Sequence, residues 1–222
     1  MSLIRIFERI QGIIPQTYRS DRLLFRSLIT WILIGLLIRL IFMPISLHED
    51  LLSTYHRSYL ILEGASNISL YRPSELIQSS FLFIYQFLLP LEELIGSNYS
   101  YATFVNHYLS YRTLFLFKIP YLIFDFASAI LFLHLFKEKE KGFLAFRFWM
   151  VNPVGIFAFY IFSRYETITI FFIMLSLFFA KINRPYSSVL SIGVGICDRV
   201  YPLLFLPFYI FFLSSVKTGF IA

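Results

Sequence analysis

The sequence predicts an all-α, polytopic membrane protein. Its 222 residues are 58% apolar and 20% aromatic, and only 14% are charged, whereas soluble globular domains carry about 25% charged residues. Several apolar runs also approach the roughly 20 residues that a helix needs to cross a hydrocarbon core about 30 Å thick. These two observations exclude an ordinary soluble domain.

Residues 1–22 form the first predicted unit, a basic amphipathic segment on the cytoplasmic face of the membrane. The segment lacks the early apolar core and the small-residue cleavage site of a signal peptide. Its apolar side chains are expected to face lipid. They are Ile4, Phe7, Ile10, Ile13 and Ile14.

Residues 23–222 form the second predicted unit, a membrane module of several helices. The first span is expected at about 23–45. Further spans are expected at about 114–136, 143–162, 168–180, 187–196 and 203–214. The last few are short, which indicates broken or re-entrant helices that pack against protein.

A long, more polar stretch at about 46–111 separates the first two spans. It contains two apolar segments, at 51–62 and 81–94, which carry charges and are too short to span comfortably. Both are predicted to be helices lying at the membrane interface. In the first, an apolar stripe at helical spacing is expected to face the membrane. This stripe contains Leu51, Leu52, Tyr55, Tyr59 and Leu62.

The basic residues between spans predict the orientation of the chain. Lys and Arg are concentrated in the N-terminal segment and in the turns at 137–141 and 181–185, which places these parts in the cytoplasm. The connections at 46–111, 163–167 and 197–202 then face the other side. Their charged residues are expected to converge on one outer cavity, because charges near the membrane are usually retained for pairing or function. They are Asp50, Arg57, Arg164, Glu166, Asp198 and Arg199.

The start of the outer stretch leaves two roles open for Asp50. Ser46 and Glu49 have the spacing of a capping box for a helix that follows. Asp50 is then either a first-turn carboxylate that the helix dipole favours, or a general base or metal ligand at the mouth of a cavity. For Asp125, deep in the second span, the alternatives are a charge pair that fixes packing and catalysis.

Several classes of partner find no support in the sequence. The net charge of +6 is dispersed rather than gathered on one patch, so no nucleic acid is expected. The chain has one cysteine, which excludes an internal disulfide. Its His, Cys, Asp and Glu residues lack zinc-ligand spacing.

The order of several short motifs resembles the membrane module of the GT-C glycosyltransferases, over about residues 22–207. The likeness is greatest to the mannosyltransferases that use polyprenyl- or dolichyl-phosphate-mannose, including those that add the first mannose to glycosylphosphatidylinositol. The motifs are Asp50, Glu63-Gly64, Tyr71, Lys118-Ile-Pro, Asp125, Trp149-Met-Val-Asn-Pro153, Ser163-Arg-Tyr-Glu166, Gly193, Gly195, Arg199-Val-Tyr-Pro202 and Pro207.

This resemblance implies an inverting transfer of a sugar, mannose in the nearest members, from a lipid phosphate to an acceptor hydroxyl on the non-cytoplasmic face. Asp50 is the expected base, and Arg199 is expected near the donor phosphate. The other residues expected to bind substrate are Arg57, Arg164, Glu166 and Tyr201. The acceptor is a glycolipid, a glycan or a protein, and the membrane is that of the ER or a prokaryotic plasma membrane.

Three positions depart from the family pattern. His48 stands where the family loop often has the first acid of an Asp-x-Asp pair, so no metal is assigned and a divalent cation stays open. Glu166 replaces an Asp, and Arg199 replaces a Lys. Family members also normally continue beyond the position of Ala222. We therefore expect a truncated chain, a minimal module with a partner membrane subunit, or a pseudoenzyme that serves as a scaffold or lipid-binding subunit.

Overall fold

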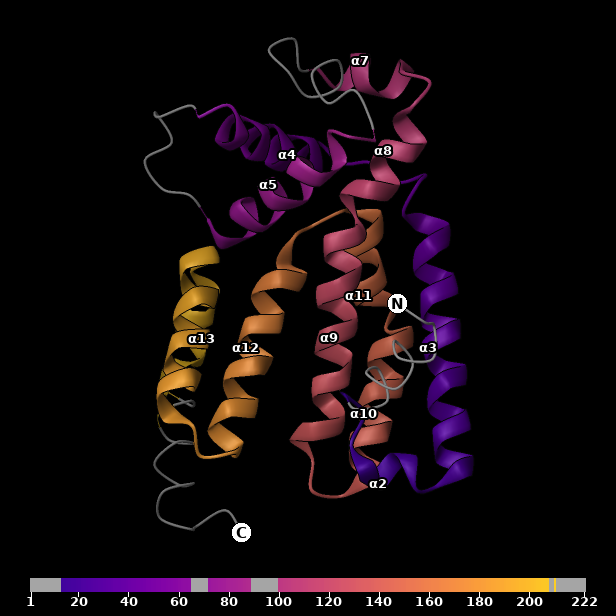
Figure 1. The fold of residues 1–222 in the computed structure, drawn as a ribbon, viewed down its shortest axis with the longest axis vertical. Coiled ribbons are helices and arrows are strands. Elements are labelled where there is room, and N and C mark those ends of the chain that lie inside the picture. The colour runs from indigo at the N-terminus through magenta and orange to yellow at the C-terminus, as the bar shows by residue number, and fades with distance from the viewer. Residues whose placement is uncertain (1–12, 65–71, 89–99, 208–209, 211–222) are drawn as a thin grey trace.

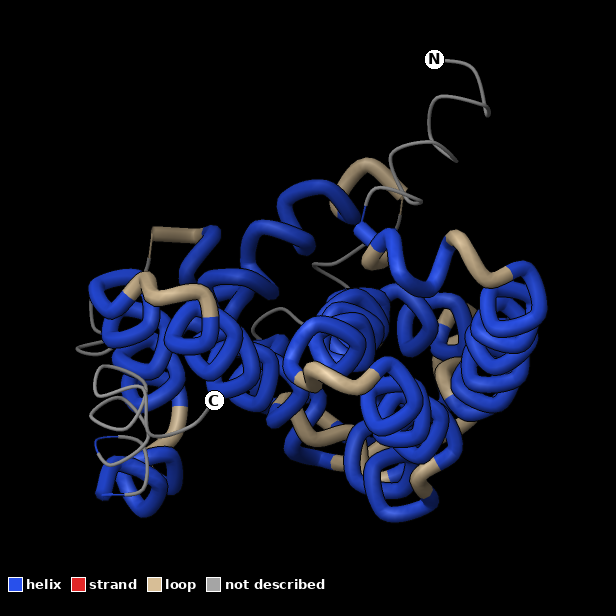
Figure 2. Tube along the Cα trace, turned by 90° about the horizontal axis from the view of Figure 1, so that it is seen from below, coloured by secondary structure: helices blue, strands red, loops and turns tan. Residues whose placement is uncertain are grey.

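The computed structural model describes residues 13–64, 72–88, 100–207 and 210. Every regular element within these ranges is a helix, as predicted (Figures 1 and 2). The long helices lie side by side in the order α13 (Pro185–Asp198), α12 (Glu166–Lys181), α9 (Ile119–Leu135), α10 (Lys139–Val151) and α3 (Arg22–Phe42).

A second group of helices lies across one end of this bundle (Figure 1). It contains α4 (Glu49–Leu62), α5 (Pro73–Tyr85) and α7 (Tyr101–Asn106), which come from the stretch predicted to lie outside the membrane, and α8 (Ser110–Phe117), which begins at the end of that stretch. α4 packs along α5, and α5 also contacts α9 and α13. The outer helices are therefore joined to the bundle.

Within the described residues, two helices are long and apolar enough to cross a membrane. They are α3 and the helix Ser110–Leu135, in which α8 continues into α9. A third candidate is bent by 41°; it consists of α10, α11 (Pro153–Ile156) and the π-helix η1 (Phe157–Ile161).

The later predicted spans are shorter. α12 and α13 contain 16 and 14 residues, or about 24 and 21 Å at 1.5 Å per residue, which is less than a hydrocarbon core of about 30 Å. After them, η2 (Tyr201–Phe205) is a 3₁₀-helix. Half of the predicted span at 203–214 lies outside the described residues. A multi-pass arrangement that includes these segments stays a prediction.

The bend in the third candidate lies at Asn152 and Pro153, where the sequence predicted a break. Proline has no N–H to donate to the preceding turn. The next N–H, that of Val154, donates to Asn152 Oδ1 at 3.1 Å instead of continuing the helix. The last carbonyls of α10 therefore lose their usual donors.

Arg39 of α3 replaces those donors. Its guanidinium donates to the carbonyl of Met150 at 2.7 Å and to that of Trp149 at 3.4 Å. The side chain is buried between the helices. A charged residue of one span thus satisfies the broken end of another, as buried backbone carbonyls require.

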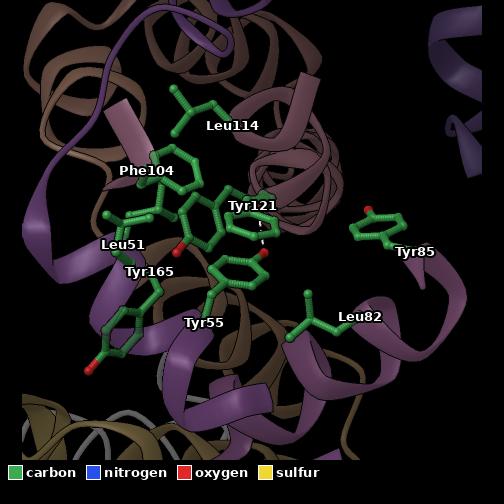
Figure 3. Packing of buried hydrophobic residues seen from close by; sticks show 10 residues of the cluster. Leu51, Tyr55, Leu82, Tyr85, Phe104, Leu114, Tyr121 and Tyr165 are labelled. Atoms are coloured by element: carbon green, nitrogen blue, oxygen red, sulfur yellow. Dashed lines mark hydrogen bonds between the residues drawn. The ribbon is translucent and has the colours of Figure 1, made fainter. Parts of the chain in front are cut away.

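The apolar stripe of α4 faces protein, so its predicted contact with the membrane is wrong. Leu51, Leu52 and Tyr55 are fully buried. They pack with Leu82 of α5 and Phe117 at the end of α8. Figure 3 shows Leu51, Tyr55 and Leu82 within this cluster. Tyr59 and Leu62 also pack against this cluster. The periodicity shows that one face is apolar, but the neighbouring amphipathic helix decides what covers that face.

The second outer helix starts earlier than predicted. α5 begins at Pro73, and Glu75 accepts the backbone N–H of Arg72 at 3.3 Å. Proline suits the first helical position because its missing N–H would have no partner there. Residues 89–94 of the predicted segment lie outside the described residues.

The N-terminal segment packs on the bundle through α2 (Gln16–Arg19). Ile14 is 3% exposed and belongs to a cluster with Leu28 and Phe146, so its predicted orientation toward lipid is wrong. Ile13 is half exposed. The remaining residues of that prediction lie outside the described ranges: Ile4, Phe7 and Ile10.

Candidate active site

A tight turn at residues 163–165 joins η1 to α12. Ser163 is buried and has a φ of 58°, a left-handed conformation that is uncommon for residues other than glycine. The N–H of Arg164 donates to the carbonyl of Ala158 at 2.9 Å, which closes the turn against η1. The turn presents Arg164 and places Glu166 at the first position of α12.

The start of α4 brings Asp50 to this turn. His48 is the N-cap residue, and its Nδ1 accepts the N–H of Asp50 at 3.1 Å. Nη1 of Arg164 donates to Oδ2 of Asp50 at 2.7 Å. Both side chains are 40% exposed, so the ion pair remains accessible.

The predicted capping box of Ser46 and Glu49 is wrong. His48 directly precedes the first helical residue and caps the helix, which leaves Ser46 two positions too early. The Ser46 hydroxyl donates to the carbonyl of Phe42 at 2.7 Å and accepts from Lys118 at 2.7 Å. Glu49 is exposed.

Arg199 extends the ion pairs across the site. Its Nη2 lies 3.1 Å from Oε1 of Glu166, and Nε of Arg164 lies 3.9 Å from the same oxygen. The structure therefore brings four predicted residues together. Consecutive ion pairs join them in the spatial order Asp50, Arg164, Glu166 and Arg199. We refer to them as the ion-pair chain.

Tyr165 supports the ion-pair chain from the core. The guanidinium carbon of Arg199 lies 4.2 Å from the centre of its ring, a cation–π arrangement. Its hydroxyl accepts a hydrogen bond from Arg72 at 2.6 Å. Figure 3 shows Tyr165 beside Leu51 of the buried cluster. Arg72 was not predicted, although its place directly before the helix start at Pro73 is a signal that was available.

Two residues that were expected at the same cavity are held elsewhere. Arg57 donates to Glu75 at 2.7 Å and to Ser53 at 3.0 Å, so it links α4 to α5. Asp198 is buried and accepts from the N–H of Ser74 at 2.8 Å and from the hydroxyl of Thr169 at 2.5 Å. Asp198 therefore joins α5, α12 and α13.

A cavity of about 560 Å³ lies beside the ion-pair chain. Its polar lining comes from Arg164, Glu166 and Tyr201. The rest of its lining is apolar, from Ala158, Phe159, Ile170, Ile173 and Phe205. The cavity thus combines a charged end with an apolar wall, which suits a ligand with a polar head and an apolar chain.

Three buried polar atoms of this region have no hydrogen-bond partner in the described part of the chain: Oε2 of Glu166, Nε of Arg199 and the hydroxyl of Tyr201. Buried polar groups usually have partners. Burial raises the pKa of Tyr201 to about 12, so its hydroxyl remains protonated at neutral pH and can donate. Of the three residues, Glu166 and Tyr201 line the cavity.

Asp125 forms the buried charge pair that was one of its two predicted roles. It accepts from Nε of Arg39 at 2.6 Å, from the indole of Trp149 at 2.7 Å and from the hydroxyl of Tyr160 at 2.9 Å. Arg39 was missed in the sequence. Its signal was a charge within an otherwise apolar span, where such residues are rare and usually paired.

The described residues contain no cluster of three or more His, Cys, Asp or Glu side chains that could hold a metal ion. Asp50 and Glu166 each lie against the guanidinium of Arg164. Cations of the protein itself therefore occupy the positions next to these carboxylates.

Comparison with known proteins gives a partial and distant relationship. GPI mannosyltransferase 1 of Candida albicans is 29% identical to this chain over 112 residues, which are 47% of the chain and 28% of that protein. No family model and no solved structure matches the chain. The similarity supports a mannosyltransferase-like relationship, and the apolar helices fit a membrane environment.

Proposed function

We propose that this chain is a membrane glycosyltransferase that moves mannose from a polyprenyl- or dolichyl-phosphate donor to an acceptor hydroxyl on the non-cytoplasmic face. The observation that carries the proposal is the ion-pair chain beside a cavity with an apolar wall. An apolar wall suits a polyprenyl chain, and arginine suits a phosphate because its guanidinium can form two parallel hydrogen bonds.

In the proposed reaction, Asp50 is the general base. Its carboxylate takes the proton of the acceptor hydroxyl while the hydroxyl oxygen bonds to the anomeric carbon of the donor sugar. The bond between that carbon and the phosphate oxygen breaks, and its electron pair leaves with the lipid phosphate. Attack on the face opposite the phosphate inverts the anomeric configuration.

The arginines stabilise the charge that develops on the departing phosphate. We assign Arg199 to the donor phosphate because it pairs with Glu166, which lines the cavity. Arg164 reaches the cavity from the other side of Glu166. In the same proposal, Glu166 and Tyr201 bind sugar hydroxyls, whereas Arg57 holds α4 on α5 through Glu75.

The test is a transfer assay in membranes that contain the full chain, with dolichyl-phosphate-mannose as donor and a glycosylphosphatidylinositol precursor as acceptor. Asp50→Asn is expected to lower the rate by about 10²–10⁴-fold, the usual contribution of a general base. Asp21→Asn is the matched control, because Asp21 caps the N-terminal end of α3, whereas the site lies beyond the C-terminal end. The transfer rate of this variant should equal that of the wild type.

The second candidate function is a non-catalytic scaffold or lipid-binding subunit. The pairing of Asp50 and Glu166 with arginines favours it, because both carboxylates already have charged partners. Under this reading, Asp50→Asn leaves transfer unchanged in membranes that contain the partner subunits. That result would reject the catalytic proposal.

A further inference from the structure

Two segments that are far apart in the chain run side by side and touch at every second residue. The Ser46 hydroxyl oxygen lies against the carbonyl of Tyr160, and Asp50 pairs with Arg164; each contact joins residues 114 positions apart. Between them, the rings of His48 and Phe162 lie 4.0 Å apart between centres. We call residues 46–50 and 160–164 the paired segments.

The paired segments have little regular structure of their own to fix this register. Residues 46–48 lie between helices. Residues 160–163 include the end of the π-helix and the left-handed Ser163. Side-chain contacts between them therefore contribute to their relative position, together with the packing of α4 and the turn hydrogen bond of Arg164.

Lys118 holds the first of these contacts. Its buried ammonium donates to the carbonyl of Ser46 at 2.5 Å, to the Ser46 hydroxyl at 2.7 Å and to the carbonyl of Tyr160 at 2.9 Å. The carbonyl of Phe42, at the end of α3, lies 3.4 Å away. One cation thus binds both paired segments from the junction of α8 and α9.

The partners of Lys118 are unusual for a buried cation. Buried charges are usually paired with an opposite charge, but the ammonium of Lys118 has no carboxylate partner among the residues that the structure describes. Its acceptors lie four residues before Asp50 in one segment and four residues before Arg164 in the other. A purely electrostatic role would favour an acid at this place, whereas backbone acceptors suit a role in fixing the chain.

We infer that Lys118 is a positioning residue that sets the register of the paired segments and thereby the contact between Asp50 and Arg164. It acts through the backbone of Ser46 and Tyr160 and touches neither charged residue. Its effect on sugar transfer rests on the proposed function. Its effect on the geometry does not, and can be measured without any substrate.

The experiment is hydrogen–deuterium exchange of the full chain in lipid nanodiscs, read by mass spectrometry. In Lys118→Met, amides of residues 46–50 and 160–166 are expected to exchange about tenfold faster or more. In the wild type, opening of these segments must break the contacts of the Lys118 ammonium, and in the variant it need not. Amides of α12 beyond residue 170 and of α13 should exchange as in the wild type.

Lys181→Met is the matched control. The Lys181 ammonium also donates to a backbone carbonyl, that of His134 at 2.7 Å, but at the opposite end of α9 from Lys118. It should leave both paired segments unchanged. The inference is overturned if Lys118→Met leaves both segments protected, or accelerates exchange equally in all helices. If the Met variant does not fold, Lys118→Gln, which keeps N–H donors, is measured by the same criteria with a smaller expected acceleration.

The two proposals fail in distinguishable ways. Faster exchange in the paired segments with no transfer by the wild-type chain would keep the role of Lys118 and reject the glycosyltransferase. Unchanged exchange in Lys118→Met, with transfer lost in Asp50→Asn, would do the reverse. If both proposals hold, Lys118→Met lowers the turnover rate while leaving the KM for the lipid donor near the wild-type value, because the apolar cavity wall is unaltered.

Discussion

Arg39 and Asp125 form a buried ion pair between α3 and α9, with 2.6 Å between Nε and Oδ2. Their side chains are 2% and 0% exposed. The same guanidinium donates to the carbonyl of Met150 in α10, and the same carboxylate accepts from Tyr160 of η1. Four elements of the fold therefore meet at one pair of charges.

Arg39→Met is expected to lower the free energy of unfolding by about 3–5 kcal/mol, because it leaves the Asp125 carboxylate buried without its counter-charge. Thermal unfolding in detergent measures the effect. The double variant Arg39→Met/Asp125→Leu should recover part of the loss, since neither charge remains. Lys141→Met removes an exposed pair with Glu138 and should change stability by at most about 1 kcal/mol. A double variant no more stable than Arg39→Met would contradict the prediction.

Gly35 lies where α3 closely approaches the end of α10. A Cβ added there would be 2.9 Å from Cε of Met150, 3.1 Å from the Met150 carbonyl oxygen and 3.2 Å from Nη1 of Arg39. Gly35→Ala is therefore expected to destabilise the protein by about 1–3 kcal/mol through overpacking.

Gly193→Ala in α13 is the matched control for Gly35→Ala. A Cβ at Gly193 meets no atom within 4 Å, so alanine should stabilise the helix by about 0.5–1 kcal/mol. Both variants are compared by chemical unfolding in the same detergent. Equal effects of the two substitutions would show that close approach at Gly35 is not the cause.

Ser163→Val tests the left-handed turn before α12. A β-branched residue at a φ of 58° is expected to lower stability by about 1–3 kcal/mol, and to release Arg164 from Asp50. Asn183→Val is the control, since Asn183 has a φ of 57° in the turn between α12 and α13. Both should lower the unfolding temperature, but only Ser163→Val should speed amide exchange at residues 160–166. Faster exchange there in the control would refute the local explanation.

Asp21 gives the fold a dependence on acid pH. Its carboxylate accepts the N–H groups of Leu23 and Leu24 at 3.1 Å, and these bonds, that of Leu24 first, lower the pKa of Asp21 below its ordinary value of 3.8. A lowered pKa in the folded state means that the carboxylate stabilises the fold above pH 3.8, and that this contribution is lost as the pH falls through the folded-state pKa.

The measurement for Asp21 is the unfolding temperature of the wild type minus that of Asp21→Ala, followed from pH 7 to pH 2. The difference is expected to be positive and constant near neutral pH, and to shrink in acid below pH 3.8. Glu138→Ala, a change at an exposed pair on the same end of the bundle, serves as the comparison. A difference that grows on acidification would disprove the linkage.

The first span and the ion-pair chain could be predicted because their signals are local. An apolar run with charges at its ends predicts α3 to within three residues at either end, 23–45 against Arg22–Phe42. Asp50, Arg164, Glu166 and Arg199 were expected together because topology places their loops on one side, and the structure joins them by ion pairs.

The same signals could not show which charged residues of the outer loops belong to the ion-pair chain and which do not. Asp198 and Arg57 lie in the same outer loops, but non-local partners hold them elsewhere. The stripe of α4 has the periodicity of a lipid-facing helix, and only the packing of α5 against it shows that it is buried. Arg39 was overlooked because hydropathy averaged over a span hides a single charge.

The bend at Pro153 and the charge at Arg39 satisfy each other's hydrogen-bonding groups. In an unbroken helix, the carbonyls of Trp149 and Met150 would accept N–H groups of the next turn. The guanidinium of Arg39 would then lose these acceptors in an apolar environment. A broken helix without Arg39 would leave the Trp149 and Met150 carbonyls without these donors. Among natural relatives of this chain, the proline and the arginine should therefore be gained and lost as a pair.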